Sequence, residues 1–581
     1  MRLVRLDGAF MSDKQSAHKY MQRKLNIVGY YGYNLDGLYD ALSVYDKELS
    51  IMLINKPDML EQLGPYGDRL IQTFKDAEKA NKNITFKLGY KEADLGGENM
   101  GFNNDQYLKG QIDKQYRKPK ESSVKVSLDH EPFDVDADIM KKVVSSDIET
   151  LQSMVREGAA TYSDIVKCFW NQVLEHKEFN AVISLNEEVV EQAEALTYDD
   201  AHDLIYGIPV LVKDNIATTD LPTTAGAAVL QNFQPSQDAE IIERLKNKGA
   251  LILGKTNLSE WANFMSTDSS NGYSAIGGQT KNAHGEFDVG GSSAGSSVAV
   301  ALGFSPVTIG SETSGSVIYP ASQNGVVGLK PTLGLVSQDG IIPISKTHDT
   351  AGPIAKTVKD TYYLFKAMTD IEETAHWDRE SLTGVKVGII DNEVIKVVYR
   401  KEDEEILSLA EEELSNAGAL TSKIIVDEEA FNVDYLNVLK HEFNMGTQSY
   451  FESYGNSGLT LDKIFDFNEQ NEIDFAPYNQ ELIRQSMEEH YTEGEKTETI
   501  RQNQTVARNA LDQAFESVDI LVTLSNYATV LYAAAGYPAL TIPGHKRSTG
   551  EPVGVTFIGK NKQDIKLLEW TYAYEKQMIE K

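Results

Sequence analysis

One stretch of the chain, residues 290–330, combines glycine, serine and small apolar residues in a way that strongly limits how the chain can fold. Its sequence is GGSSAGSSVAVALGFSPVTIGSETSGSVIYPASQNGVVGLK. Two serine-bearing glycine turns, at residues 290–293 and 313–316, are separated by a small-residue apolar run. Glycine permits positive φ and a close approach of the backbone to a ligand. Serines in such turns present hydroxyls beside backbone N–H groups, which suits attack on a carbonyl and binding of the resulting oxyanion.

Glycine-rich motifs alone are also compatible with a simple loop or a phosphate-binding loop. A second element of the sequence favours a catalytic site instead. Residues 207–216, GIPVLVKDNI, form an apolar strand-like run that is interrupted by Lys213. Burial disfavours the charged form of a lysine, so a buried lysine can become a neutral base near pH 7. The alternative is a lysine at a strand end whose amine extends to water.

Together with motifs elsewhere, these elements resemble the amidase signature family. The motifs follow in order between residue 145 and the end of the chain: GIPVLVKDNI, LGKTNLSEWANF, GGQTKN, GGSSAGS, GSETSGS, GVVGLKPT and DTAGP. The resemblance implies an α/β fold with a central mixed sheet covered by helices on both faces. It also implies a Ser-Ser-Lys triad, in which Ser316 is the nucleophile, Ser292 the bridging serine and Lys213 the base.

The family mechanism needs neither a metal nor an organic cofactor. By that mechanism, neutral Lys213 is expected to take a proton from Ser316 through the hydroxyl of Ser292, and Ser316 to attack the amide carbon. The acyl-enzyme is then cleaved by water. The oxyanion is expected to bind the backbone N–H groups of four consecutive residues: Thr313, Ser314, Gly315 and Ser316.

Other interpretations of the same residues remain open. A relay of Ser316, His348 and Asp349 is disfavoured because no G-x-S-x-G elbow surrounds Ser316. The family's usual arginine two residues after the nucleophile is Ile318 here, so Glu312 is expected to lack a local ion partner. TNLSEWANF and GGQTKN look most like peptide amidases, which predicts a small or peptide-terminal linear amide as substrate. The A subunit of a tRNA-dependent amidotransferase is the alternative within the family.

The first 88 residues follow a different α/β pattern, which ends before a polar segment. Its centre, YYGYNLDGLYD at residues 30–40, resembles barstar, the inhibitor of extracellular bacterial ribonucleases. The predicted elements are a strand at Leu3–Leu6, a helix at Asp13–Leu25, a helix at Asn34–Val44, a strand at Leu49–Ile54, a helix at Tyr66–Ala80 and a strand at Ile84–Leu88. The family's contact positions fall on Tyr30, Asp36, Tyr39, Asp40 and Asp76.

The charge of this segment leaves two roles open. Asp36 and Asp40 share one helix face and could imitate RNA phosphates to a basic cleft. However, residues 1–88 carry 13 Lys and Arg against 11 Asp and Glu. Because electrostatic steering of an inhibitor needs an acidic surface, a fold kept for docking or stability is the alternative. The whole chain could therefore also be a ribonuclease-binding protein with an accessory amidase domain.

The composition of the chain indicates its domain boundaries and limits the classes of partner and site that it can have. Residues 89–144 are rich in Gly, Asn, Asp, Lys and Gln, which predicts a linker between a domain at 1–88 and an amidase domain at 145–581. The net charge of −32 argues against nucleic-acid and anionic-membrane partners. The single cysteine, Cys168, excludes a disulfide framework and a multi-cysteine metal site. Without an apolar signal region or an 18-residue apolar run, we expect a cytoplasmic protein.

Within the amidase domain the pattern predicts alternating strands and helices. The acidic, more helical residues 371–515 are expected to line the substrate pocket, as in the family. The predicted elements nearest the motifs are a strand at Pro209–Lys213, a helix at Asp238–Lys248, a strand at Leu251–Gly254 and a helix at Ser259–Phe264.

Overall fold

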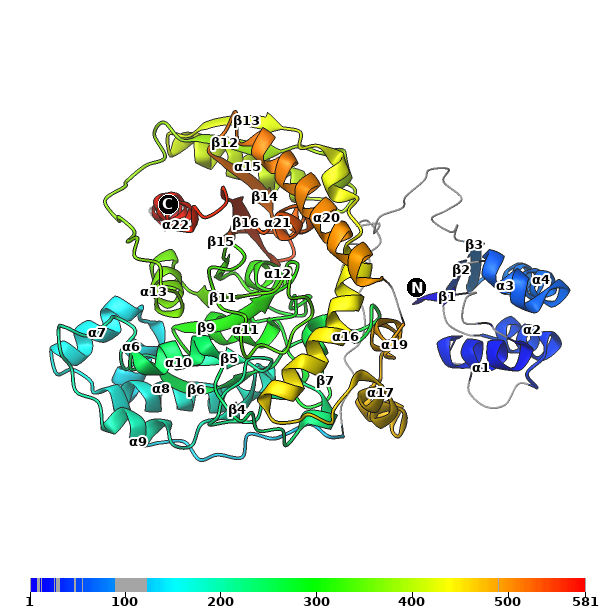
Figure 1. Cartoon of the computed structure of the whole chain (residues 1–581), viewed down its shortest axis with the longest axis horizontal. Coiled ribbons are helices and arrows are strands. Elements are labelled where there is room, and N and C mark those ends of the chain that lie inside the picture. Colours follow the sequence, from blue (N-terminus) through cyan, green and yellow to red (C-terminus); the bar gives the residue numbers. More distant parts are fainter. Residues whose placement is uncertain are drawn as a thin grey trace. The chain divides into compact units, whose positions relative to one another are not determined.

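The computed structural model of the chain describes residues 2–7, 11, 13–25, 27, 32–45, 49–54, 56–88, 123–488 and 491–579. Its contacts divide the chain into two compact units, Met1–Met100 and Gly101–Lys581. Each unit has a hydrophobic core of its own, so each is described by itself (Figure 1).

The N-terminal unit is a three-stranded parallel sheet with helices, in the strand order β1-β2-β3. The short apolar runs at β2 and β3 form strands with the predicted bounds. The helix α3, with the sequence KPDMLEQL, was not predicted, because its apolar stripe is weak. The elements are β1 (Arg2–Asp7), α1 (Lys14–Leu25), α2 (Leu35–Ser43), β2 (Leu49–Ile54), α3 (Lys56–Leu63), α4 (Pro65–Ala80) and β3 (Ile84–Leu88).

The orientation of α2 follows from its N-cap. The side chain of Asn34 accepts a hydrogen bond from the backbone N–H of Gly37 at 2.8 Å, which starts the helix. Leu38 and Leu42 are then buried against the core. Asp36 and Asp40, on the other side of the helix, are exposed.

The large unit is built on an eleven-stranded sheet in the order β13-β12-β14-β16-β15-β10-β11-β9-β5-β6-β4. Four of its pairings are parallel and six are antiparallel, so the sheet is mixed, as predicted. The strands are β4 (Val182–Leu185), β5 (Pro209–Lys213), β6 (Leu251–Thr256), β9 (Val307–Glu312), β10 (Val327–Lys330), β11 (Thr350–Ala355), β12 (Lys386–Ile390), β13 (Leu420–Ile424), β14 (Ile520–Leu524), β15 (Ala539–Lys546) and β16 (Pro552–Ile558). A separate two-stranded ribbon contains β7 (Tyr273–Ser274) and β8 (Gly278–Gln279).

Helices cover this sheet. The α-helices are α6 (Ala137–Ser145), α7 (Ile148–Arg156), α8 (Tyr162–Glu175), α9 (Val189–Glu194), α10 (Glu240–Asn247), α11 (Ala294–Ala301), α12 (Ile318–Gln323), α13 (Val358–Met368), α14 (Glu393–Lys396), α15 (Asp403–Asn416), α16 (Tyr435–Tyr454), α17 (Leu461–Glu469), α18 (Glu472–Phe475), α19 (Glu481–Ser486), α20 (Glu493–Ala514), α21 (Thr529–Ala535) and α22 (Asp564–Ile579). Short 3-10 helices are η3 (Lys177–Phe179), η4 (Ala228–Leu230), η5 (Glu260–Asn263) and η6 (Glu428–Phe431).

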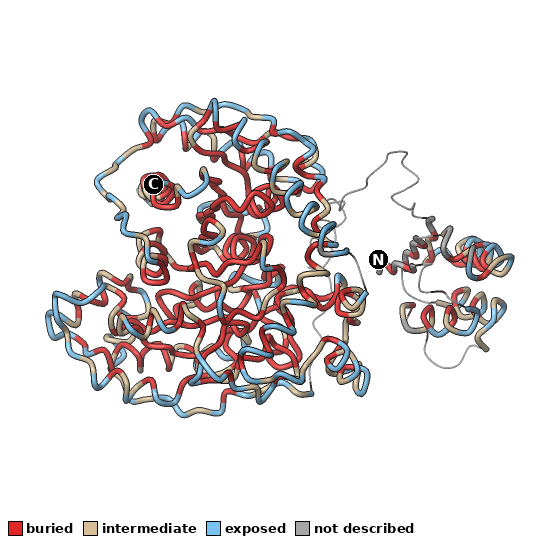
Figure 2. The backbone as a smooth tube through the Cα atoms, in the orientation of Figure 1, coloured by how far each residue is buried: buried red, intermediate tan, exposed pale blue. Residues whose placement is uncertain are grey.

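The helices lie on both faces of the central strands. Along β11, Ile354 packs in a cluster with Val300 of α11 and Ala321 of α12. Ala351 and Ala355 point the other way, into the main core, where α13 packs against α10 and α22. The central strands are buried throughout, and exposed backbone is confined to the periphery of the unit (Figure 2).

The structure adds to one expectation and differs from another. Residues 123–144, the described part of the predicted linker, pack on the large unit: Leu128 and Val143 are buried in its main core, and the N–H of Val126 bonds to the Ile276 carbonyl at 2.9 Å. The sequence conceals this packing because polar residues separate the few apolar ones of the segment. The helix expected at Ser259–Phe264 is a 3-10 turn, in which Trp261 and Ala262 have φ of 53° and 54°.

None of the helices among the described residues is both long and apolar enough to span a bilayer. Residues 371–515 contain helices α14 to α20 and also two strands, β12 and β13, which extend the central sheet to its edge. The sequence predicts a helical stretch here, because the two strands are short apolar runs within an acidic segment.

Candidate active site

The site forms where two parallel strands end. β5 pairs with β9, with Val210 opposite Val307 and Val212 opposite Ile309. Because the strands are parallel, their carboxyl ends meet, and Lys213 and Glu312 close the two strands at the same edge. Such edges are where open α/β sheets place their reactive groups.

Lys213 is 0% exposed, and its amine is surrounded by protein groups. The Nζ atom lies 2.7 Å from Ser292 Oγ, 2.9 Å from Ser311 Oγ and 3.0 Å from the Ser311 carbonyl oxygen. Burial lowers the pKa of Lys213 to about 7, against the charges of Asp349 and Glu312, which favour the protonated form. The amine is therefore poised between its two protonation states at neutral pH.

The partners of the amine determine where its lone pair points. A neutral amine has two N–H groups and one lone pair. The Ser311 carbonyl can only accept, and the Ser311 hydroxyl already lies 3.0 Å from Asn215 Nδ2. When both N–H groups are directed to Ser311, the lone pair is left for the hydroxyl proton of Ser292.

The turn that carries Ser292 depends on close packing around its glycines. Gly290 has φ of 70°, and a Cβ there would lie 2.6 Å from Pro320 Cα. The Gly291–Ser292 peptide is cis, and the Ser292 carbonyl accepts the N–H of Ser259 at 3.0 Å. Directly after the turn, α11 begins at Ala294.

Ser316 is joined to this turn through the backbone. The N–H of Ser293 donates to the Ser316 carbonyl at 3.0 Å, and Ser293 Oγ donates to the Ser311 carbonyl at 3.1 Å. Ser316 keeps 8% exposure, and its hydroxyl makes no hydrogen bond to any residue that the structure describes. The expected contact between the Ser292 and Ser316 hydroxyls is thus not closed; such contacts commonly tighten only in the substrate complex.

The turn of residues 313–316 has the features expected of an oxyanion site. Gly315 has φ of 83°, which only glycine adopts readily. Within the described parts of the chain, the backbone N–H groups of these four residues donate no hydrogen bond to protein. The side chains hold the turn instead: Ser314 Oγ lies 3.3 Å from Thr529 Oγ1, and the Tyr435 hydroxyl donates to the Thr313 carbonyl at 2.9 Å.

The histidine alternative does not fit this geometry. The Nδ1 atom of His348 lies 2.9 Å from Ser345 Oγ and 3.0 Å from Thr347 Oγ1, within its own loop. Burial lowers the pKa of His348 to about 3. Asp349 bonds to Thr313 Oγ1 at 2.6 Å rather than to the imidazole. The three groups therefore form no serine-histidine-carboxylate relay.

Glu312 is hydrogen-bonded through one carboxylate oxygen only, and its Oε1 atom has no hydrogen-bond partner among the described residues. Its Oε2 atom accepts the N–H groups of Val317 and Ile318 at 2.8 and 3.0 Å, at the start of α12. The pKa of buried Lys330 is lowered by burial to about 8, and the charge of Glu312 opposes that shift. The amides at the start of α12 and the nearby charge of Lys330 thus compensate only in part for the arginine that the family usually has here.

Three residues that hold the site were not predicted as site residues: Ser293, Ser311 and Tyr435. The sequence position of Ser311 could have indicated a site residue, because it lies near the carboxyl end of a buried strand next to the strand of Lys213. Nothing in the sequence near Tyr435 indicated its role, since it contacts Thr313 across 122 residues of sequence.

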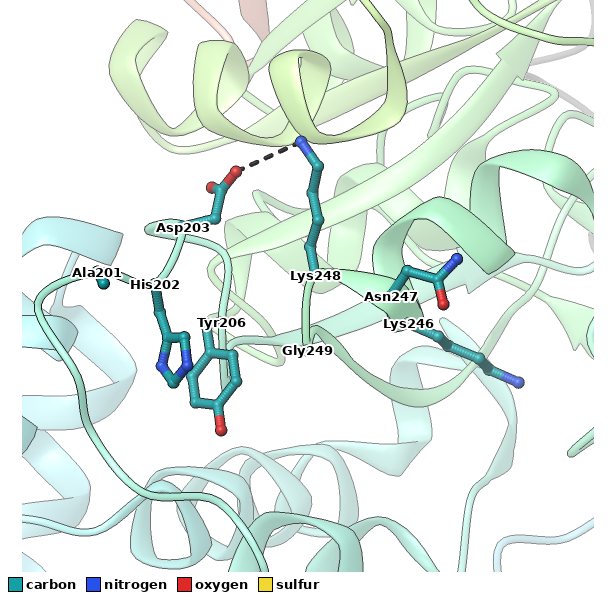
Figure 3. A pocket seen from close by; sticks show the side chains of 8 residues that line it. All are labelled: Ala201, His202, Asp203, Tyr206, Lys246, Asn247, Lys248 and Gly249. Carbon is teal, nitrogen blue, oxygen red and sulfur yellow. Dashed lines mark hydrogen bonds and ion pairs between the residues drawn. The ribbon is translucent and has the colours of Figure 1, made fainter.

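Other candidate sites are less suited to chemistry. Among the described residues, no group of three His, Cys, Asp or Glu side chains could hold a metal ion. A surface hollow lies between the loop before β5 and the end of α10 (Figure 3). Its lysines are already paired: Lys248 with Asp203 at 3.3 Å, and Lys246 with Asp220 and Asp238.

The barstar-like contact positions lie on two helices of the N-terminal unit. Asp36 and Asp40 are exposed on α2, and Tyr39 between them is half-buried against the core. On α4, Asp76 pairs with Lys79 at 3.6 Å and accepts from Gln72 at 2.9 Å. Tyr30 lies outside the described residues.

Comparisons with known proteins match both units of the chain to known families. The family model "Amidase" matches residues 164–525, more than half of the chain, and the model "Barstar (barnase inhibitor)" matches residues 1–91. The A-type subunit of glutamyl-tRNA(Gln) amidotransferase from Picosynechococcus sp. is 31% identical, over 64% of this chain and 84% of the relative.

Two solved structures are also similar. An amidase family protein from Bacillus anthracis has a TM-score of 0.73 and 32% identity, over 83% of this chain and 99% of that one. Native peptide amidase from Stenotrophomonas maltophilia has a TM-score of 0.67 and 32% identity, over 75% and 97%. The chain therefore belongs to the amidase family and is an amide hydrolase, with a barstar-like segment at its N-terminus.

Proposed function

We propose that this chain hydrolyses linear carboxamides through Lys213, Ser292 and Ser316. The observation that carries the proposal is the fully buried Lys213 amine, 2.7 Å from the hydroxyl of Ser292. A buried amine poised near neutrality can take the proton that a serine must lose to become a nucleophile.

The reaction proceeds in two halves. Neutral Lys213 accepts the proton of Ser292, which accepts that of Ser316, and Ser316 Oγ bonds to the amide carbon. The tetrahedral oxyanion is stabilised by backbone N–H groups of the 313–316 turn, which have no described protein partner. The proton returns to the leaving nitrogen, the C–N bond breaks, and an ester on Ser316 remains. Water, deprotonated by the same relay, hydrolyses the ester and releases the acid.

The proposed substrate is a small amide or the amide end of a peptide. The similarity to a peptide amidase at 32% identity supports this class. The similarity to an A-type amidotransferase chain supports a second candidate, in which the ammonia is passed on to another chain. Release of free ammonia from a dipeptide amide by this chain alone would distinguish hydrolysis from such a transfer.

Substitution of the triad tests the mechanism. Lys213→Ala and Ser316→Ala should each lower kcat for a dipeptide amide by about 10³-fold or more, because each removes an essential proton-transfer or bonding group. Ser292→Ala should leave a small residual rate. The matched control is Ser297→Ala on α11, whose buried hydroxyl has no partner among the described residues. Undiminished turnover after either of the first two changes would contradict the mechanism.

A second function is proposed for the N-terminal segment, namely binding of a ribonuclease through α2. The observation that favours it is the exposed pair Asp36 and Asp40 on one helix face of a segment that matches the barstar model. Carboxylates in this arrangement can contact the arginines and lysines of a phosphate-binding cleft.

A further inference from the structure

Asp349 is a buried carboxylate beside the site, and the steps above give it no role. Its position follows from strand register: β11 runs antiparallel to β9, with Thr350 opposite Glu312. The residue before β11 is thereby placed next to the residue after β9. Asp349 and Thr313 therefore meet at the entrance to the 313–316 turn.

The carboxylate of Asp349 ties that turn to a neighbouring loop. One oxygen accepts the Thr313 hydroxyl at 2.6 Å, and the other accepts the N–H groups of Ile344 and Ser345 at 2.8 and 2.9 Å. The carbonyl of Thr313 is held on its other side by the Tyr435 hydroxyl. The first residue of the turn is thus fixed at both its side chain and its backbone.

The same carboxylate acts on the base. Asp349 is the leading charge that opposes the lowering of the Lys213 pKa by burial, and Glu312 follows it. Burial raises the pKa of Asp349 itself to about 7, and the like charge of Glu442 acts in the same direction. When two titrating groups interact in this way, the apparent pKa values that an experiment observes belong to the pair rather than to either residue.

We propose that Asp349 is a positioning residue for amide hydrolysis, which fixes the turn carrying Ser316 through Thr313 and, by its charge, sets the pH at which the Lys213 amine becomes free to accept a proton. This inference rests on the lysine-serine mechanism proposed above. It predicts two separable effects, one on rate and one on pH dependence.

The main experiment compares the full chain with its Asp349→Asn variant, using a dipeptide amide between pH 5 and 9. The kcat on the alkaline plateau should fall by up to about tenfold. The asparagine NH₂ either faces the loop N–H groups, from which it cannot accept, or faces Thr313, where a neutral bond replaces a charge-assisted one. The midpoint of the acid limb should move to lower pH by about half a unit or more, because loss of the negative charge favours neutral Lys213. A midpoint that stays in place or rises would overturn the electrostatic part.

Variants of Thr313 test positioning separately. Thr313→Val keeps the charge of Asp349 but removes the hydrogen bond, so kcat should fall by about tenfold with a smaller shift of the acid limb. Thr313→Ser restores the hydroxyl and should recover most of kcat. Equal activity of the valine and serine variants would overturn the positioning role, and this comparison holds even if Asp349→Asn does not fold.

Two sets of control variants distinguish a failure of the proposed mechanism from a failure of the role proposed for Asp349. Asp360→Asn removes another buried carboxylate, one on α13 that accepts the N–H of Ile148 at 3.0 Å, and should leave the acid limb in place. If Lys213→Ala and Ser316→Ala remain active, the proposed mechanism itself fails. If both are inactive and Asp349→Asn leaves the midpoint unmoved, only the role of Asp349 fails.

Discussion

At the scale of single residues, the proposed mechanism depends on the Lys213 amine being neutral inside the protein. Lys213 has no exposed surface, and its three neighbours are a carbonyl and two hydroxyls, none of which carries a charge. Burial lowers its pKa from the usual 10.5 to about 7, whereas the charges of Asp349 and Glu312 limit the shift. A lysine in this state can serve as a base at neutral pH.

The rate should consequently rise with pH. Because only the neutral form of Lys213 accepts a proton, kcat should fall as pH drops through about 7 and reach a plateau above it. The measurement is the pH profile of kcat for a dipeptide amide between pH 5 and 9. A rate that stays flat down to pH 5 would contradict a lysine base.

Lys213, Ser292 and Ser316 stand out in the sequence because each lies in a short local motif, and their catalytic roles stay a prediction. Lys213 interrupts an apolar strand, and both serines lie in glycine turns. Ser311, Asp349 and Tyr435 complete the site through contacts that depend on strand register and on helix packing across long stretches of sequence. Of these residues only Ser311 had a local indication, its place near the carboxyl end of a buried strand, and no local pattern indicates the contacts of Asp349 and Tyr435.

At the scale of elements, the site depends on how tightly the turns approach their neighbours. The 290–293 turn lies against α12, and the 313–316 turn connects β9 to α12. The first turn meets the backbone of Ser259 and of Pro320, and the second is held by the side chains of Asp349, Tyr435 and Thr529. A side chain added to such a turn must move those segments as well.

Substitutions of Gly290 and Gly334 together test whether the close approach of a turn to its neighbours matters. Both have positive φ, 70° and 84°, but a Cβ at Gly290 would meet Pro320 at 2.6 Å, whereas a Cβ at Gly334 would meet nothing within 4 Å. Gly334→Ala should cost about 1–2 kcal/mol of backbone strain and leave kcat unchanged. Gly290→Ala should destabilise more and lower kcat by about 10²-fold, because the Ser292 turn is displaced.

Urea unfolding and kinetics of the two variants provide the measurement. If Gly290→Ala and Gly334→Ala changed stability and activity equally, the effect at Gly290 would come from backbone strain alone and not from the clash with α12.

Elements with continuous apolar runs were the most predictable. β2, β3 and β5 have the expected bounds because a short buried strand needs only a run of apolar residues. The sequence predicts a helix at Trp261 instead of the turn, since the apolar spacing there is helical and the left-handed backbone is imposed by packing. α6 was not predicted because it follows a polar segment.

At the scale of the whole molecule, two units with separate cores share one chain. Residues 1–88 carry a net charge of +2, while the chain as a whole carries −32. The acidity of the protein thus belongs to the residues that follow the barstar-like segment. Any basic partner of the N-terminal unit must recognise local charges there, such as those on α2.

Binding of a small basic bacterial ribonuclease to the full chain should therefore depend on α2. Asp36→Asn combined with Asp40→Asn should weaken the affinity, measured by titration calorimetry, by about tenfold or more, because two charge-assisted contacts are lost. Asp68→Asn on α4, also exposed, is the control. If the unaltered chain shows no affinity, the segment serves docking or stability instead.

The seclusion of the Lys213 amine has a consequence for chemical labelling. A lysine of lowered pKa is more often neutral at pH 7, and a neutral amine is the form that reacts with acylating reagents. Here the amine has no surface open to such a reagent, whereas Ser316 retains a small accessible surface. Proteome-wide lysine profiling would thus pass over the proposed base, and under the proposed mechanism a phosphonylating serine probe is the reagent that should label the protein, at Ser316.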